Sequence, residues 1–182
     1  MRAVVWVAAA LVASAVAAEP ADGWQVFGPD ALGIGRDQVA VQMPLQCGSE
    51  DAEPDLLVCQ PAPGAMSTFA GVPVQKIELT FRGDRLEKVT GRLHESQFEA
   101  LERFITARAG AGRDCSYLFR GGMGAAEFVN RILLWRAPDY ALVIQQFQGK
   151  IDRSVFSYGT PGAMAEVVKE KTAYPPRSRR DL

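Results

Sequence analysis

The strongest constraint on the fold is a stretch of alternating apolar and polar residues between residues 76 and 93, interrupted only around the turn. Apolar side chains alternate with polar ones on both sides of Gly83-Asp84, a pair that suits a two-residue turn. The residues that share the apolar face are Ile77, Leu79, Phe81, Val89, Gly91 and Leu93. Because successive side chains of a strand point to opposite faces, the stretch predicts an antiparallel hairpin with one buried face.

A helix is expected directly after the hairpin. Ser96-Gln97-Phe98-Glu99 fits a capping box, in which a serine hydroxyl and a glutamate satisfy free backbone amides at a helix start. Apolar residues then recur at helical spacing, and Gly110 suits the end of the helix. They are Phe98, Leu101, Phe104 and Ile105.

The second half of the chain repeats this plan. Strand-like runs cover Tyr117-Leu118-Phe119, 131–136, 140–148 and 154–158, and in the third of these Leu142 and Ile144 face opposite to Val143. Thr160-Pro161 opens a last helix that turns Met164, Val167 and Val168 inward. The predicted class is α+β: strand sets at 56–93 and 117–158 form one antiparallel sheet, packed on one face by two helices near 96–109 and 161–171 in two layers.

The first residues resemble an export signal. Arg2 precedes a short, alanine-rich apolar run that ends in small residues before Glu19. We expect a signal peptide over residues 1–18, cleaved after Ala17 or Ala18, and hence a periplasmic or secreted protein. The alternative, a membrane anchor, fits less well because the run is short and weakly hydrophobic. No integral membrane segment is expected after cleavage.

The rest of the chain is long enough for a single α+β domain over residues 19–172. Residues 173–182 form a proline- and arginine-rich tail, for which we expect disorder. Residues 32–41 are compatible with a short helix or a strand. The formal net charge of the whole sequence is −1, which does not favour nucleic acid as a partner.

Three cysteines allow three single-bridge pairings. In an exported protein we expect a disulfide between Cys47 and Cys59, because it would close the short acidic loop between them and leave Cys115 over.

The segment around residues 68–74 resembles sequences of known proteins. Thr68-Phe69-Ala70-Gly71-Val72-Pro73-Val74, with the cysteine pair before it and the hairpin and helix after it, resembles a group of small secreted proteobacterial proteins without an established activity. Residues 33–39 resemble the helix start of the small lipoprotein of the outer-membrane barrel-assembly machine, and the order of elements is similar to that of the β-lactamase inhibitor proteins. The chain lacks the lipidated cysteine of the former and any motif for the inhibitory loop of the latter, so neither resemblance implies a function.

Few residues point to chemistry. His94 is the single histidine, and it lies two residues before Ser96. We expect a non-enzymatic binding module for a protein or another component of the cell envelope. The alternative is a hydrolase or thiol enzyme that uses Ser96 or Cys115 with His94 as the base.

No metal and no cofactor are expected. The acidic run Glu50–Asp55 lacks the spacing and central glycine of a calcium loop. Gly121-Gly122-Met123-Gly124 lacks the lysine and hydroxyl residue of a phosphate-binding loop.

Overall fold

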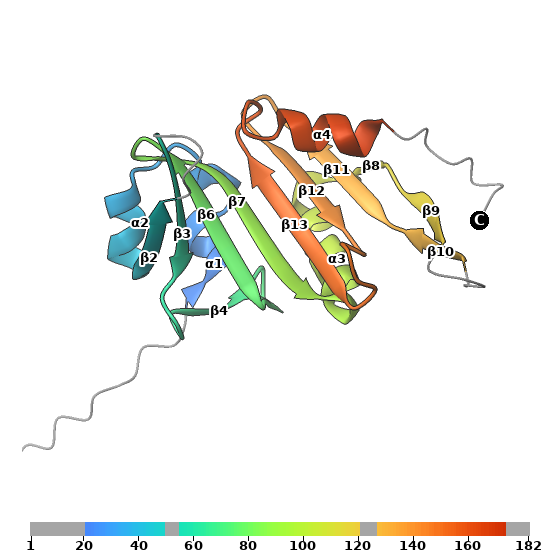
Figure 1. The fold of residues 1–182 in the computed structure, drawn as a ribbon, viewed down its shortest axis with the longest axis horizontal. Helices are drawn as coiled ribbons and strands as arrows, with labels where there is room; N and C mark the ends of the chain where they lie inside the picture. Colours follow the sequence, from blue (N-terminus) through green and yellow to red (C-terminus); the bar gives the residue numbers. More distant parts are fainter. Residues whose placement is uncertain (1–20, 50–54, 121–126, 174–182) are drawn as a thin grey trace, which may run out of the picture.

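The computed structural model describes residues 21–49, 55–120 and 127–173 (Figure 1). Several sequence predictions lie outside these ranges: the signal peptide at 1–18, nearly all of the acidic run at 50–55, the glycine run at 121–124 and the tail from 174 onward.

The described chain forms an α+β fold, as predicted. Its strands are β1 (Ala21–Asp22), β2 (Leu45–Ser49), β3 (Leu56–Pro61), β4 (Met66–Phe69), β5 (Val72–Pro73), β6 (Lys76–Arg82), β7 (Arg85–His94), β8 (Arg113–Asp114), β9 (Tyr117–Arg120), β10 (Glu127–Asn130), β11 (Ile132–Arg136), β12 (Ala141–Gln145) and β13 (Arg153–Gly159). Its helices are α1 (Gly23–Phe27), α2 (Arg36–Gln42), α3 (Phe98–Ala109) and α4 (Ala165–Thr172), with 3₁₀ turns at Pro29–Ala31 and Glu95–Gln97.

One eight-stranded antiparallel sheet dominates the molecule, in the order β2-β3-β6-β7-β13-β12-β11-β8. Strands β7 and β13 pair along seven residues, from Lys88 opposite Gly159 to His94 opposite Arg153, and so join the two predicted strand sets. A large antiparallel sheet that joins both strand sets is therefore confirmed, although the predicted strand at 117–119 is not part of it. Strands β9 and β10 form a separate pair, and β1, β4 and β5 form a small sheet in which β1 runs parallel to β4.

The predicted central hairpin is formed by β6 and β7, with Arg82 opposite Arg85 on either side of the turn. Gly83 adopts φ +58° in the turn, the left-handed conformation that glycine adopts at low cost. The register shifts between Thr80 and Phe81, and this bulge brings Leu86 opposite Phe81 and onto the buried face. The sequence carries a sign of this bulge, because two polar residues, Glu87 and Lys88, interrupt the alternation between Leu86 and Val89.

Helix α3 begins at Phe98, so the predicted capping box of Ser96 and Glu99 is wrong. The chain leaves β7 through a 3₁₀ turn, and His94 caps that turn by accepting a hydrogen bond at Nδ1 from the Ser96 amide, 3.3 Å away. The tight turn takes up the residues that were expected to start the helix. At the other end Gly110 has φ +75° and confirms the predicted stop.

The two long helices lie on opposite faces of the large sheet, not on one face as predicted. Helix α3 packs in the main core with Leu142 and Ile144, whereas α4 packs with Val143 and its face neighbours. Figure 1 shows α3 behind the strands and α4 in front of them. A strand whose two faces are both apolar needs cover on both sides, and β12 is buried at all five positions.

The last helix differs from the prediction in its start. Helix α4 begins at Ala165, after a turn in which the Thr160 hydroxyl accepts a hydrogen bond from the Ala163 amide at 3.3 Å. Its inward residues are confirmed, since Met164, Val167 and Val168 pack against the sheet.

Residues 36–42 form a helix, which decides between the helix and the strand that the sequence allowed for this segment.

The Asp22 carboxylate connects the start of the described chain to residues 68–74, the run for which a resemblance was noted. Asp22 accepts hydrogen bonds from the amides of Trp24 at 2.8 Å and Ala70 at 2.9 Å, and from the Thr68 hydroxyl at 3.1 Å. The run itself forms β4, a turn and β5.

The predicted disulfide is present. Cys47 on β2 and Cys59 on β3 are direct cross-strand neighbours with Cα atoms 4.0 Å apart. Cys115 is a free, buried thiol. A disulfide fits an oxidising compartment.

Candidate functional site

The structure brings together two of the three residues of the enzymatic alternative. His94 Nδ1 lies 2.9 Å from Ser96 Oγ, and both side chains are exposed at the end of β7. The same ring nitrogen also faces the Ser96 amide. The contact therefore serves the 3₁₀ turn, and both groups lie on an open surface.

Cys115 is not part of that pair. It lies in the cluster beneath α4 with Ile132 and Met164, and only 3% of its surface is exposed. Burial raises the pKa of the Cys115 thiol, and the neighbouring Arg113 partly opposes that shift. A protonated, enclosed thiol is a poor nucleophile.

A better candidate is a half-open pocket of about 190 Å³ beside the connection between β12 and β13, which we call the turn pocket. It lies next to the pair β9–β10. Its lining residues are Tyr117, Asn130, Gln145, Phe147, Gly149, Lys150 and Ile151.

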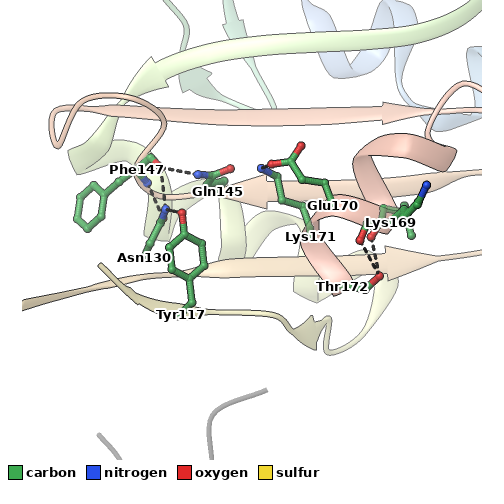
Figure 2. Close-up of polar contacts among 9 residues, drawn as sticks. Tyr117, Asn130, Gln145, Phe147, Lys169, Glu170, Lys171 and Thr172 are labelled. Atoms are coloured by element: carbon green, nitrogen blue, oxygen red, sulfur yellow. Dashed lines mark hydrogen bonds and ion pairs between the residues drawn. The ribbon is translucent and has the colours of Figure 1, made fainter. Parts of the chain in front are cut away.

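A hydrogen-bonded amide network forms one wall of the turn pocket (Figure 2). Asn130 is 2% exposed, and its Nδ2 donates to the Phe147 carbonyl at 2.9 Å and to the Tyr117 hydroxyl at 3.1 Å. Its Oδ1 accepts from the Phe147 amide at 2.9 Å. The side chain thus pairs with the Phe147 backbone as a neighbouring strand would, and it holds the start of the β12–β13 connection in place.

Gln145 is the unusual member of the network. It is 5% exposed, and its Nε2 donates to the Phe147 carbonyl at 2.5 Å. Since a carbonyl only accepts, this bond identifies the other amide atom as Oε1. That oxygen is buried and has no hydrogen-bond partner among the described residues. Figure 2 shows it turned away from Phe147, towards the side on which α4 ends.

The rest of the pocket wall is largely apolar. Ile151 is 59% exposed, although it is a large aliphatic residue. The rings of Phe147 and Phe128 meet edge to face with centroids 6.4 Å apart, and Phe128 is itself exposed. Lys150 adds a cation to the rim. Exposed apolar side chains grouped beside a pocket are typical of a binding surface.

The turn pocket was not predicted from the sequence. The sequence contained one indication of it. Gln145 lies on the same face of its strand as Ala141 and Val143, so an amide side chain ends an otherwise apolar face. Asn130, before β11, and Tyr117, on β9, reach the same pocket through pairing that the local pattern does not encode.

Comparison with known proteins adds no relatives: no family model, no curated protein and no solved structure matches this chain. The resemblance drawn from residues 68–74 therefore stays a prediction. Within the described ranges, no helix has the length and apolar character needed to cross a membrane. In the same ranges, no three histidine, cysteine or acidic side chains gather as metal ligands would.

Proposed function

We propose that this chain is a non-enzymatic binding protein of the periplasm or the extracellular space, and that it recognises a protein or another envelope component through the turn pocket. The observation that carries the proposal is a pocket with largely apolar sides whose lining includes Gln145, a residue with a buried and unpartnered Oε1. A buried acceptor without a donor costs about 1–3 kcal/mol. If the Gln145 amide group turns its oxygen to the pocket, a bound group that donates a hydrogen bond to it recovers part of that free energy.

The size of the pocket limits what it can hold. At about 190 Å³ it is smaller than the roughly 300–1,000 Å³ of pockets for drug-sized ligands. We therefore infer that it receives one side chain or one terminal group of a larger partner. An aromatic group with a donor at its edge, such as indole or phenol, matches a pocket with largely apolar sides and the Gln145 acceptor.

The enzymatic alternative has one observation in its favour, the 2.9 Å contact between His94 and Ser96. The contact is local, because the two residues are separated by one residue and cap a turn. Binding at the turn pocket explains a buried, unpaired group that the enzymatic alternative leaves unexplained.

Small aromatic probes test the proposal. We expect indole to bind in the turn pocket and to shift the amide resonances of Gln145, Phe147 and Ile151. Because one hydrogen bond contributes about 0.5–1.5 kcal/mol, indole should bind about 2- to 10-fold more tightly than 1-methylindole, which lacks the donor. Titration followed by ¹H–¹⁵N spectra measures both dissociation constants.

The matched variant is Gln145→Met, which keeps the length of the side chain and removes the acceptor. In this variant the preference for indole over 1-methylindole should disappear. The control Gln46→Met changes an exposed residue on β2 and should leave the preference intact. Equal binding of the two probes to the unaltered protein, or shifts that map elsewhere, would refute the proposal.

A further inference from the structure

A row of directly opposed residues crosses four strands on the face that α4 partly covers. Gln145 on β12 lies opposite Val155 on β13, Val155 lies opposite Arg92 on β7, and Arg92 lies opposite Lys76 on β6. Directly opposed residues share a sheet face. Arg92 and Lys76 therefore lie on the same face as the turn pocket. Since neighbouring strands are about 4.8 Å apart, Arg92 is about 10 Å from Gln145.

The opposed cations are an unfavourable pair by themselves. Cross-strand neighbours have Cβ atoms about 5 Å apart, and like charges in that position destabilise a sheet. Lys76 Nζ contacts Glu78 Oε1 at 2.7 Å. No salt bridge joins Arg92 to a carboxylate in the part of the chain that the structure describes.

A shallow hollow of about 150 Å³ lies between these two cations, and we call it the cation hollow. Its lining residues are Lys76, Glu78, Thr90, Gly91, Arg92, Gln148 and Val155. The Thr90 hydroxyl is paired with the Ser157 hydroxyl at 3.2 Å. The Gln148 amide group is a further potential donor at the edge of the hollow.

Two further cations lie on the same face of the sheet. Lys88 and Arg153 lie on the same face of β7 and β13, because they oppose Thr80 and His94. Glu78 also lines the hollow, and its contact with Lys76 offsets the charges of both residues, so Arg92 supplies the net positive charge of the lining. The whole chain has a formal net charge of −1, so the cations are concentrated locally and do not reflect a basic protein.

We propose that the cation hollow binds an anionic group, a carboxylate or a phosphate, with Arg92 as its main contact and Lys76 as its second. The planar guanidinium of an arginine binds two oxygens of such a group at once, and the lysine acts as a point charge. A bound anion is attracted by Arg92, and Lys76 adds a second attraction that its contact with Glu78 weakens. The site depends on residues other than those of the turn pocket, so each proposal can fail without the other.

Inorganic phosphate and acetate are the probes. Each is titrated into the unaltered protein at constant ionic strength, set with sodium chloride, and followed by ¹H–¹⁵N spectra. We expect saturable shifts centred on the amides of Lys76, Thr90, Arg92 and Gln148. Tighter binding of phosphate identifies a phosphate site, and tighter binding of acetate identifies a carboxylate site.

Two variants provide the matched comparison. Arg92→Gln should weaken binding of the preferred probe about tenfold or more. Arg103→Gln changes an exposed arginine of α3, on the other side of the sheet, and should leave binding unchanged. Lys76→Gln should weaken binding less than Arg92→Gln.

The melting temperature separates a binding role from a structural one. Because Arg92→Gln removes a like-charge contact, its melting temperature without a probe should equal or exceed that of the unaltered protein, and the rise on adding the probe should be lost. The proposal is overturned if neither probe gives saturable shifts beyond those of sodium chloride. It is also overturned if Arg92→Gln and Arg103→Gln bind equally well.

Discussion

Gly91 shows how one missing side chain allows the two strand sets to pack together. It lies on β7 directly opposite Phe156 of β13. A Cβ atom at this position would lie 2.2 Å from two atoms of the Phe156 ring and 2.9 Å from Ile77 Cδ1. The same ring stacks on Phe69 with centroids 4.2 Å apart. The Phe156 ring therefore fills the space above Gly91, and its stacking on Phe69 restricts its movement away from that position.

We expect Gly91→Ala to lower the free energy of unfolding by about 1–3 kcal/mol, because the added methyl group overpacks the core. Urea unfolding measures the change. Gly162→Ala is the control, since a Cβ atom there has no atom within 4 Å and its backbone is not left-handed. A loss in Gly91→Ala no greater than in the control would mean that the Phe156 ring moves aside at little cost.

The Cys47–Cys59 disulfide holds strand β2 against its neighbour β3. Strand β2 is the edge of the large sheet, and most of its described side chains are exposed. The Cys47–Cys59 bond connects it to β3, whose Cys59 is fully buried in the main core. The link thus fastens an edge strand that contributes little apolar area of its own.

We expect removal of this disulfide to loosen β2 without unfolding the core. The bond spans 12 residues, and closing such a loop stabilises a protein by roughly 2–3 kcal/mol. The double variant Cys47→Ser, Cys59→Ala avoids a buried hydroxyl at position 59. Hydrogen exchange should accelerate at β2 amides and stay slow at β6 and β7. Complete loss of folded structure would contradict this expectation.

At the scale of the molecule, the buried hydrophobic side chains of the described residues form two clusters on opposite faces of one sheet. The main cluster includes α3, α1 and the central hairpin, and the smaller one is covered by α4. Each cluster contains a buried group that can lose a proton at alkaline pH. The group is the Tyr158 hydroxyl in the main cluster and the Cys115 thiol in the smaller one. The Tyr158 hydroxyl has no hydrogen-bond partner among the described residues.

Both groups predict a loss of stability at alkaline pH. Burial raises the pKa of Tyr158 well above its ordinary value of about 10, and burial raises the pKa of Cys115 above its ordinary value of about 9. Above those ordinary values the unfolded chain releases protons that the folded chain retains. The two groups therefore leave the free energy of unfolding unchanged below about pH 9. We expect that free energy to decrease as the pH rises further.

Urea unfolding between pH 7 and pH 11 measures this decline. In Tyr158→Phe the decline above about pH 10 should become shallower, and stability at pH 7 should equal or exceed that of the unaltered protein, because an unpaired buried hydroxyl is removed. Cys115→Ala should remove the part of the decline that begins near pH 9. An unchanged profile in both variants would assign the alkaline loss to other groups.

Local patterns in the sequence were sufficient to predict the central hairpin, the end of α3 at Gly110, the Cys47–Cys59 bond and the α+β class. These features depend on neighbouring residues: alternation defines the apolar face of a strand, and a glycine permits a left-handed turn. Tertiary structure alone decided that α3 and α4 cover opposite faces, that His94 caps the turn before α3, and that Tyr117, Asn130 and Gln145 meet at one pocket. Periodicity tells which face of an element is apolar, but which element covers that face, and which polar groups stay unpaired beneath it, depends on packing between segments far apart in the chain.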